Sequence, residues 1–149
     1  TSEGWQLTQY DANGIAFGRR DSPTGKTYVA QIIAHHRPPV NTPDELLAIF
    51  KTETEKDYLP DRFKPIELHF QLTSERPYPC VRFRGTIEDL KSRTPQGTLS
   101  LPLHVRSLYC QHPTQRDLGG FISYSQRGGP PDPDLDFQTQ SFIDGAQVP

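Results

Sequence analysis

Hydrophobic and polar residues alternate along several segments of the chain, and this alternation predicts a sheet. The clearest segment is 66–72, IELHFQL, in which every even-numbered residue is apolar and every odd-numbered residue is polar. Successive side chains of a strand point to opposite faces, so this strand should bury its even-numbered face. Six further segments are rich in β-branched and aromatic residues, which favour strands: residues 5–10, 15–19, 27–35, 80–88, 99–110 and 120–126.

Two other segments have patterns typical of helices. Thr42 can cap a helix that begins at Pro43, and Glu45 stands at the capping-box position. We expect this helix to extend over about 43–57. Its apolar side consists of Leu46, Leu47, Ile49 and Phe50. A shorter helix is expected over about 135–146, with Leu135, Phe142, Ile143 and Ala146 facing inward.

The order of these elements (strands, a helix, a meander of strands, a final helix) indicates an α+β fold. We expect an antiparallel sheet of about six to seven strands, with the helices at about 43–57 and 135–146 packed on it. The chain has 149 residues, enough for one domain with its own core, and no repeat or linker divides it. Flexible ends are expected at 1–3 and 147–149.

The composition changes this picture only slightly. Hydrophobic residues make up 33% of the chain and there are 15 prolines, which alone would favour disorder. The net charge is only -2, however, and one tryptophan, six tyrosines and eight phenylalanines are available for a core. This charge gives no electrostatic basis for nucleic-acid binding. No apolar run approaches the ~18 residues of a transmembrane helix.

The segments 80–88 and 99–110 should form a hairpin whose register follows from their apolar residues. The apolar faces match only if the numbers of paired residues have an even sum, because a slip by one residue turns a whole face over. If the numbers of paired residues add up to 190, the turn is centred at position 95, in the segment that contains Pro95 and Gly97. Cys80 then lies opposite Cys110.

Pro102 tests this register independently. Proline has no N–H, so it must stand in a non-hydrogen-bonded pair, here with Glu88. Cys110 is eight residues further on and has the same pair type, in which Cα atoms are about 4.5 Å apart and within disulfide reach. The sequence therefore predicts a Cys80–Cys110 disulfide, unless a bulge breaks the register. Such a disulfide favours an oxidising compartment, either the periplasm or the cell exterior.

Other chemistry for the cysteines and histidines has less support. Cys110 and His112 have the spacing of a nucleophile and its base or of two metal ligands, but no second ligand pair accompanies them. A disulfide would also consume the thiol. Side chains of His35 and His36 would point to opposite faces of a strand, which is typical of a surface position rather than of joint ligands. We predict no catalytic residue, metal site or cofactor.

Basic residues should gather on the second face of the sheet. If 66–72 pairs with 80–87 with apolar faces matched, a sum of 153 aligns His69, Arg84 and Arg106 across three strands. Arg84 opposite Arg106 is unfavourable unless something anionic compensates. Either a nearby carboxylate (Asp132, Asp134 or Asp136) neutralises solvated arginines, or the face binds an anion or a partner. The patch consists of His69, Arg82, Arg84, His104 and Arg106.

In outline the chain resembles small, largely uncharacterised periplasmic and lipoprotein-like proteins of the bacterial envelope. The likeness rests on an early tryptophan strand at Trp5 and on the segments TPDELL, PCVRF, YCQHP and ISYSQRG. It covers most of the chain and implies a sheet-and-helix arrangement like the photosystem extrinsic-protein (PsbP-like) fold. It implies no catalytic residue. A lipid-bearing cysteine would lie upstream of Thr1. The chain has no methionine, so we expect it to start downstream of an initiator, after a cleaved leader or a shortening.

These observations lead to two expectations about function. The first is a non-enzymatic envelope protein that binds an unknown envelope partner or helps assembly. The alternative is a module or hydrolase that binds a small anion through the Arg/His patch. The absence of a nucleophile motif or a metal cluster in the sequence favours the first.

Overall fold

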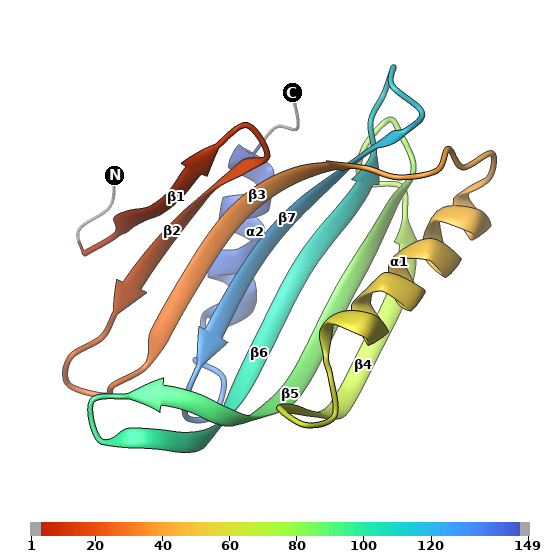
Figure 1. Cartoon of the computed structure of the whole chain (residues 1–149). Helices are drawn as coiled ribbons and strands as arrows, with labels where there is room; N and C mark the ends of the chain where they lie inside the picture. Colours follow the sequence, from red (N-terminus) through yellow and green to blue (C-terminus); the bar gives the residue numbers. More distant parts are fainter. Residues whose placement is uncertain (1–3, 147–149) are drawn as a thin grey trace.

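The computed structural model describes residues 4–146. The ends predicted to be flexible, 1–3 and 147–149, lie outside these residues. The centre of the molecule is one seven-stranded antiparallel sheet with the order β1-β2-β3-β7-β6-β5-β4 (Figure 1). The strands are β1 (Gln6–Asp11), β2 (Gly14–Arg20), β3 (Thr27–His36), β4 (Phe63–Thr73), β5 (Cys80–Thr94), β6 (Gly97–Gln111) and β7 (Leu118–Arg127). The predicted α+β fold is confirmed.

Strand β7 joins two blocks of strands. The first three strands form one meander and β4, β5 and β6 form another, while β7 pairs with β3 on one side and β6 on the other. The link from β3 to β4 carries the first helix and takes the chain to the far edge of the sheet (Figure 1). As a result, β3 and β6 are separated only by β7, although they are far apart in the sequence.

The two helices pack on opposite faces of the sheet (Figure 1). Helix α1 (Pro43–Asp57) has the predicted bounds and lies over β4 and β5. The Thr42 hydroxyl accepts a hydrogen bond from the Glu45 N–H at 3.2 Å, as a capping residue should. Helix α2 (Leu135–Gly145) packs on β6 and β7.

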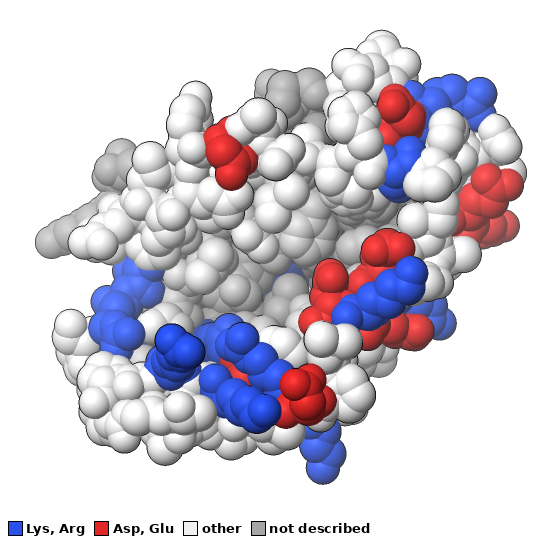
Figure 2. All heavy atoms as spheres, in the orientation of Figure 1, with Lys and Arg blue, Asp and Glu red and all other residues white. Residues whose placement is uncertain are grey.

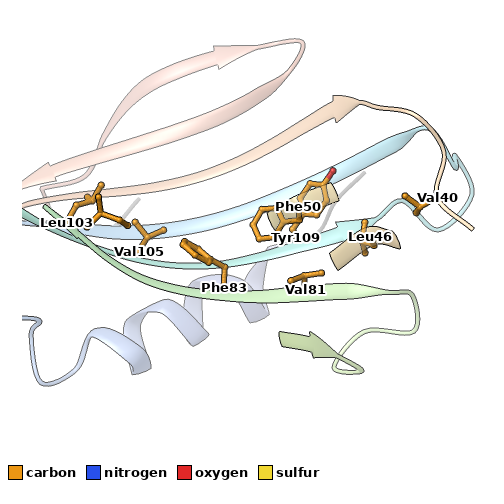
Figure 3. Close-up of a cluster of buried hydrophobic side chains, with 9 residues drawn as sticks. Val40, Leu46, Phe50, Val81, Phe83, Leu103, Val105 and Tyr109 are labelled. Carbon is orange, nitrogen blue, oxygen red and sulfur yellow. The ribbon is translucent and has the colours of Figure 1, made fainter. Parts of the chain in front are cut away.

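The core on the α1 face is rich in aromatic rings (Figure 3). Leu46 is fully buried, and the ring of Phe50 stacks on that of Tyr109 with centroids 4.7 Å apart. Phe83 meets Phe50 edge to face at 6.1 Å. Such offset and edge-to-face ring pairs stabilise a core beyond the area that they bury.

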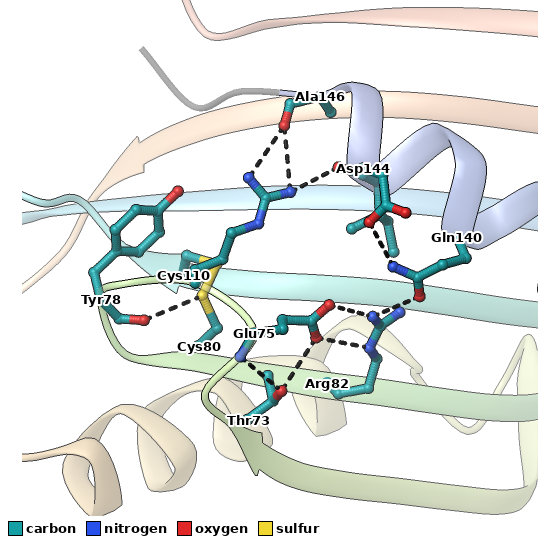
Figure 4. Close-up of polar contacts among 11 residues, drawn as sticks. Thr73, Glu75, Tyr78, Cys80, Arg82, Cys110, Gln140, Asp144 and Ala146 are labelled. Carbon is teal, nitrogen blue, oxygen red and sulfur yellow. Dashed lines mark hydrogen bonds and ion pairs between the residues drawn. A yellow bond between two sulfur atoms is a disulfide. The ribbon is translucent and has the colours of Figure 1, made fainter.

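The core on the α2 face contains the disulfide. Cys80 and Cys110 are paired across β5 and β6 and joined, with Cα atoms 4.1 Å apart, which confirms the predicted bond (Figure 4). Pro102 lies opposite Glu88, so the register deduced from it is also confirmed. Arg76 donates to the Ile143 carbonyl oxygen at 2.6 Å and so ties the end of α2 to this region.

Strand β4 departs from strict alternation at one point. The register with β5 shifts between Pro65 and Glu67, and Ile66 between them is 61% exposed rather than buried. Proline at an edge strand cannot donate a ladder hydrogen bond, and a bulge next to it turns Ile66 away from the core. The bulge also makes this edge a poor template for pairing with another strand.

Candidate functional site

The five basic residues of the predicted patch lie on the sheet face that α2 covers. His69, Arg84 and Arg106 form one row across β4, β5 and β6, in the predicted register. Arg82 and His104 stand in the neighbouring rows. The structure therefore places these residues on one face, but it also gives each of them a partner within the protein.

Asp136 neutralises the two opposed arginines. Its carboxylate accepts from Arg106 Nε at 2.8 Å and from Arg84 Nη1 at 3.0 Å. The hydrogen bond from Arg106, with a second from Arg84, holds the pKa of Asp136 below its ordinary value. A carboxylate of the C-terminal helix is thus the counterion, which was one of the two interpretations of the sequence.

The other three basic residues are also engaged. Arg82 donates to Glu75 at 2.6 Å and to Gln140 at 2.8 Å (Figure 4). His69 Nε2 lies 2.5 Å from a Glu67 oxygen, and buried His104 lies 3.0 Å from the Gly129 carbonyl. An anion bound here would have to compete with these groups, so the anion site stays a prediction.

The opposite face carries a groove that the sequence did not reveal. Helix α1 covers only the β4 side of this face, and Figure 2 shows a hollow beside it, with acidic side chains gathered over α1. The hollow contains a cavity of about 270 Å³ between α1 and strands β3, β5, β6 and β7. Its aromatic lining consists of Phe50, Tyr58, Phe83, Tyr109 and Phe121, and its polar lining includes Gln31, His35, Glu53 and Asp57.

A hydrogen-bonded triad closes one end of the groove. The Tyr109 hydroxyl accepts from Arg37 Nε at 2.8 Å and lies 3.0 Å from His35 Nε2. Burial, followed by the nearby Arg37 charge, lowers the pKa of His35. The lowered pKa favours the uncharged imidazole, and the Tyr109 hydroxyl and His35 Nε2 share one hydrogen bond. The His35 ring also stacks on Tyr109, with centroids 5.5 Å apart.

Two carboxylates line the wall formed by α1. Glu53 and Asp57 are four residues apart, so both face the groove from successive turns. Burial, and then the Glu53 charge, raises the pKa of Asp57. Glu53 lies 3.6 Å from the exposed Lys56 ammonium. The Asp57 side chain has no hydrogen bond or ion pair with any residue in 4–146.

A buried hydroxyl lies on the same sheet face. Ser107 is fully buried, and its Oγ has no hydrogen-bond partner among the described residues. It stands between Phe83 on β5 and Ser123 on β7, and Ser123 in turn faces Gln31 on β3. Ser107 thus lies on the α1 face in the row between Phe83 and Gln31, but it is covered by its neighbours and does not line the cavity. Most buried polar groups have a partner, so an orphan hydroxyl here needs an explanation.

Of the residues that line this groove, only His35 was weighed as a candidate for chemistry from the sequence. His35 and His36 were both expected at surface positions, and both are exposed, although the His35 ring also contacts Tyr109. Glu53 and Asp57 lie on the predicted helix beyond its apolar residues, and no motif in the sequence marked them. The Cys110-x-His112 spacing forms no reactive pair, because Cys110 is in the disulfide and His112 Nδ1 accepts backbone N–H groups of Thr114 and Gln115.

Two further observations concern metal ions and membranes. Within 4–146, no three His, Cys, Asp or Glu side chains are grouped in a way that could hold a metal ion. None of the helices in this part of the chain is both long and apolar enough to cross a membrane. Comparison of the chain with protein-family models and with curated proteins finds no match.

Proposed function

We propose that this protein is a non-catalytic binding domain that takes up a small organic ligand in the groove between α1 and the sheet. The observation that carries the proposal is the groove itself, a cavity of about 270 Å³ between α1 and the sheet that is lined largely by aromatic rings. Concave, largely apolar sites with a few convergent polar groups are the usual form of small-ligand sites.

The polar groups of the groove suit binding better than catalysis. A nucleophilic hydroxyl needs a base within hydrogen-bond reach, and Ser107 has no such partner in the described chain. His35 has its Nε2 occupied by the Tyr109 hydroxyl. The polar side chains that line the groove, among them Gln31 and His35, can orient a ligand, but they do not form a nucleophile and a base.

The disulfide supports a cellular compartment for the proposed ligand binding. Cys80 and Cys110 are joined, and structural disulfides persist in oxidising compartments outside the cytoplasm. Together with the resemblance to small envelope proteins, this supports the bacterial periplasm or cell envelope as the compartment. The protein would there bind its ligand rather than transform it.

Binding of a neutral fluorescent probe, N-phenyl-1-naphthylamine, tests the proposal. We expect saturable binding to the disulfide-bonded protein and a loss of about tenfold in affinity when Gln31→Trp fills the groove. Gln9→Trp is the matched control, because Gln9 is exposed on the edge strand β1, outside the groove. No binding, or equal binding by both variants, would contradict the proposal.

The same preparation identifies the occupant. Native mass spectrometry should show a bound small molecule or an empty groove that takes up the probe. A bound peptide, or a dimer in sedimentation velocity that excludes the probe, would show a different occupant and overturn the proposal.

A further inference from the structure

We infer that β1 is the edge through which two copies of this chain associate, by pairing their β1 strands antiparallel and joining their two sheets into one. The two-fold axis of this dimer would pass between Thr8 and Gln9. Strand β1 does not line the proposed ligand groove, so the inference goes beyond the proposed function and does not depend on it.

The first argument is that the outer edge of β1 is unprotected. Strand β1 ends the sheet, and all six of its residues are exposed (Figure 1). Proteins usually protect such edges with lysine, proline or bulges that prevent pairing with another chain. The other edge strand, β4, carries Lys64 and Pro65 beside its bulge, whereas β1, with the sequence QLTQYD, contains no Lys, Arg or Pro.

The second argument is that the two faces of β1 follow an order that suits pairing with a copy of itself. Leu7 lies opposite Phe17 of β2, which lines a cavity beside α2. Tyr10 lies opposite Ile15, which pairs in turn with Ile32 in the core of the α2 face. Leu7 and Tyr10 therefore lie on the α2 face.

A bulge places the other residues of β1 on the α1 face. The register with β2 shifts around Thr8, and Gln9 lies opposite Ala16, which pairs with Gln31 of the groove. A Cβ at Gly18 would lie 3.2 Å from the Thr8 methyl carbon, so Thr8 lies on the same face as Gly18. The residues of β1 on the α1 face are Gln6, Thr8, Gln9 and Asp11.

The faces from Gln6 to Asp11 thus follow the order α1, α2, α1, α1, α2, α1, which reads the same in both directions. If the numbers of paired residues add up to 17, every residue of one copy meets a residue of its own face in the other, and Leu7 lies opposite Tyr10. A shift by one position would set Tyr10 opposite Gln6 or Thr8, on the other face. The bulge therefore specifies one register of the dimer.

The third argument is that this register pairs apolar residues and avoids opposing charges. Leu7 is 56% exposed and Tyr10 is 77% exposed, and each would cover the other across the axis. Asp11, the one charged residue of β1, would face Gln6. Six residues a copy are fewer than the about 20–30 of a standard interface, so we expect a weak, reversible dimer.

Sedimentation velocity of the full, disulfide-bonded chain, from about 1 to 500 μM, tests the inference. We expect a reversible monomer–dimer equilibrium within this range. Leu7→Lys should weaken the dimer at least about tenfold, because it places a charge opposite Tyr10 of the other copy. Phe137→Lys is the matched control, because Phe137 is 71% exposed on α2, away from the edge, and its replacement should leave the dimer unchanged.

Cysteine cross-linking tests the register. Leu7→Cys combined with Tyr10→Cys should form a covalent dimer on oxidation with copper phenanthroline, because residues directly opposite in an antiparallel pair are within disulfide reach. The two positions are about 10 Å apart along one strand, so they cannot bridge within a chain. Gln6→Cys combined with Tyr10→Cys is the control, since these residues lie on opposite faces and should give little covalent dimer.

Three outcomes would overturn the inference. The first is a chain that stays monomeric over the whole concentration range, which would leave the β1 edge to a strand of another protein. The second is a dimer that Leu7→Lys and Phe137→Lys weaken equally. The third is equal cross-linking of the two cysteine pairs. If circular dichroism shows that Leu7→Lys does not fold, Tyr10→Lys provides the same test from the other side of the pair.

Discussion

Arg84 on β5 and Arg106 on β6 lie directly opposite each other and share the carboxylate of Asp136 on α2. Replacing Asp136 with asparagine should therefore reduce the free energy of unfolding. The Arg106 side chain is only 8% exposed, so water cannot fully replace its counterion. Asp136 itself is 64% exposed, which limits the loss to about 1–2 kcal/mol. Urea denaturation measures it.

Asp144→Asn is the matched control for this substitution. Asp144 lies on the same helix and, within residues 4–146, accepts only from Gln140, at 2.7 Å on the surface. Its replacement should change the free energy of unfolding by less than about 0.5 kcal/mol. Equal losses in Asp136→Asn and Asp144→Asn would mean that Asp136 is not a required counterion.

The same ion pair predicts a pH dependence. The hydrogen bond from Arg106 lowers the pKa of Asp136 in the folded protein, while the unfolded chain has an ordinary value near 3.9. The stability that Asp136 contributes is therefore fully present above the unfolded pKa and is lost as the pH falls through the folded pKa. The difference in unfolding free energy between wild type and Asp136→Asn should shrink below about pH 4. A difference that stays constant on acidification would contradict this.

Local features of the sequence were enough to predict this part of the fold. The alternation in 66–72 and the missing N–H of Pro102 fixed the register of β4, β5 and β6, because both signals act between neighbouring strands. The same register placed Cys80 opposite Cys110. Asp136 was one of three carboxylates available to the arginines, and only the packing of α2 selects it.

The groove could not be predicted in this way, because it depends on contacts between distant segments. His35 reaches Tyr109 only because β7 enters the sheet between β3 and β6. Between them stands Gly119, paired with His35 on one side and Gln111 on the other. No local pattern indicates this strand order, nor that α1 covers only part of the face. Alternation predicted that His35 and His36 point to opposite faces, but not that the His35 ring meets Tyr109.

The disulfide should contribute strongly to stability. It closes a loop of 30 residues, for which the chain-entropy model gives about 3–4 kcal/mol. Cys80→Ala with Cys110→Ala should therefore lower the free energy of unfolding by up to this amount in urea, and a reducing agent should have no effect on the double variant. The bond consumes both thiols, so wild type denatured without a reducing agent should show no alkylatable thiol. Two thiols alkylated without reductant would contradict the bond.

The Tyr109 hydroxyl should matter for stability as well as for the groove. Tyr109→Phe removes the acceptor of the Arg37 hydrogen bond and the hydroxyl that bonds His35 Nε2, and the loss of these part-buried hydrogen bonds predicts about 1–2 kcal/mol. Tyr10→Phe is the control, since Tyr10 is 77% exposed on β1 and should be neutral. The pKa of His35, followed by NMR, should change in Tyr109→Phe and not in Tyr10→Phe. An unchanged His35 titration would contradict the contact.

Gly119 should be required for the position of the Tyr109 ring. A Cβ at Gly119 would lie 2.3 Å from Tyr109 Oη and 2.8 Å from its Cζ. The ring cannot move freely, because Phe50 stacks on it at 4.7 Å. Gly119→Ala should therefore lower the free energy of unfolding by about 1–3 kcal/mol. Gly145→Ala should instead raise it by up to about 1 kcal/mol, since Gly145 ends α2 and its added Cβ would meet no described atom within 4 Å.

A double-mutant cycle shows whether the Gly119 effect acts through Tyr109. The shorter side chain in Tyr109→Phe removes the atom nearest to the new Cβ, so Gly119→Ala should cost less in that background than in the wild type. Residues in contact typically couple by at least about 0.5 kcal/mol, which urea denaturation can resolve. Additive losses would mean that the alanine at 119 acts elsewhere on β7, and that the Tyr109 ring does not lie over this glycine in solution.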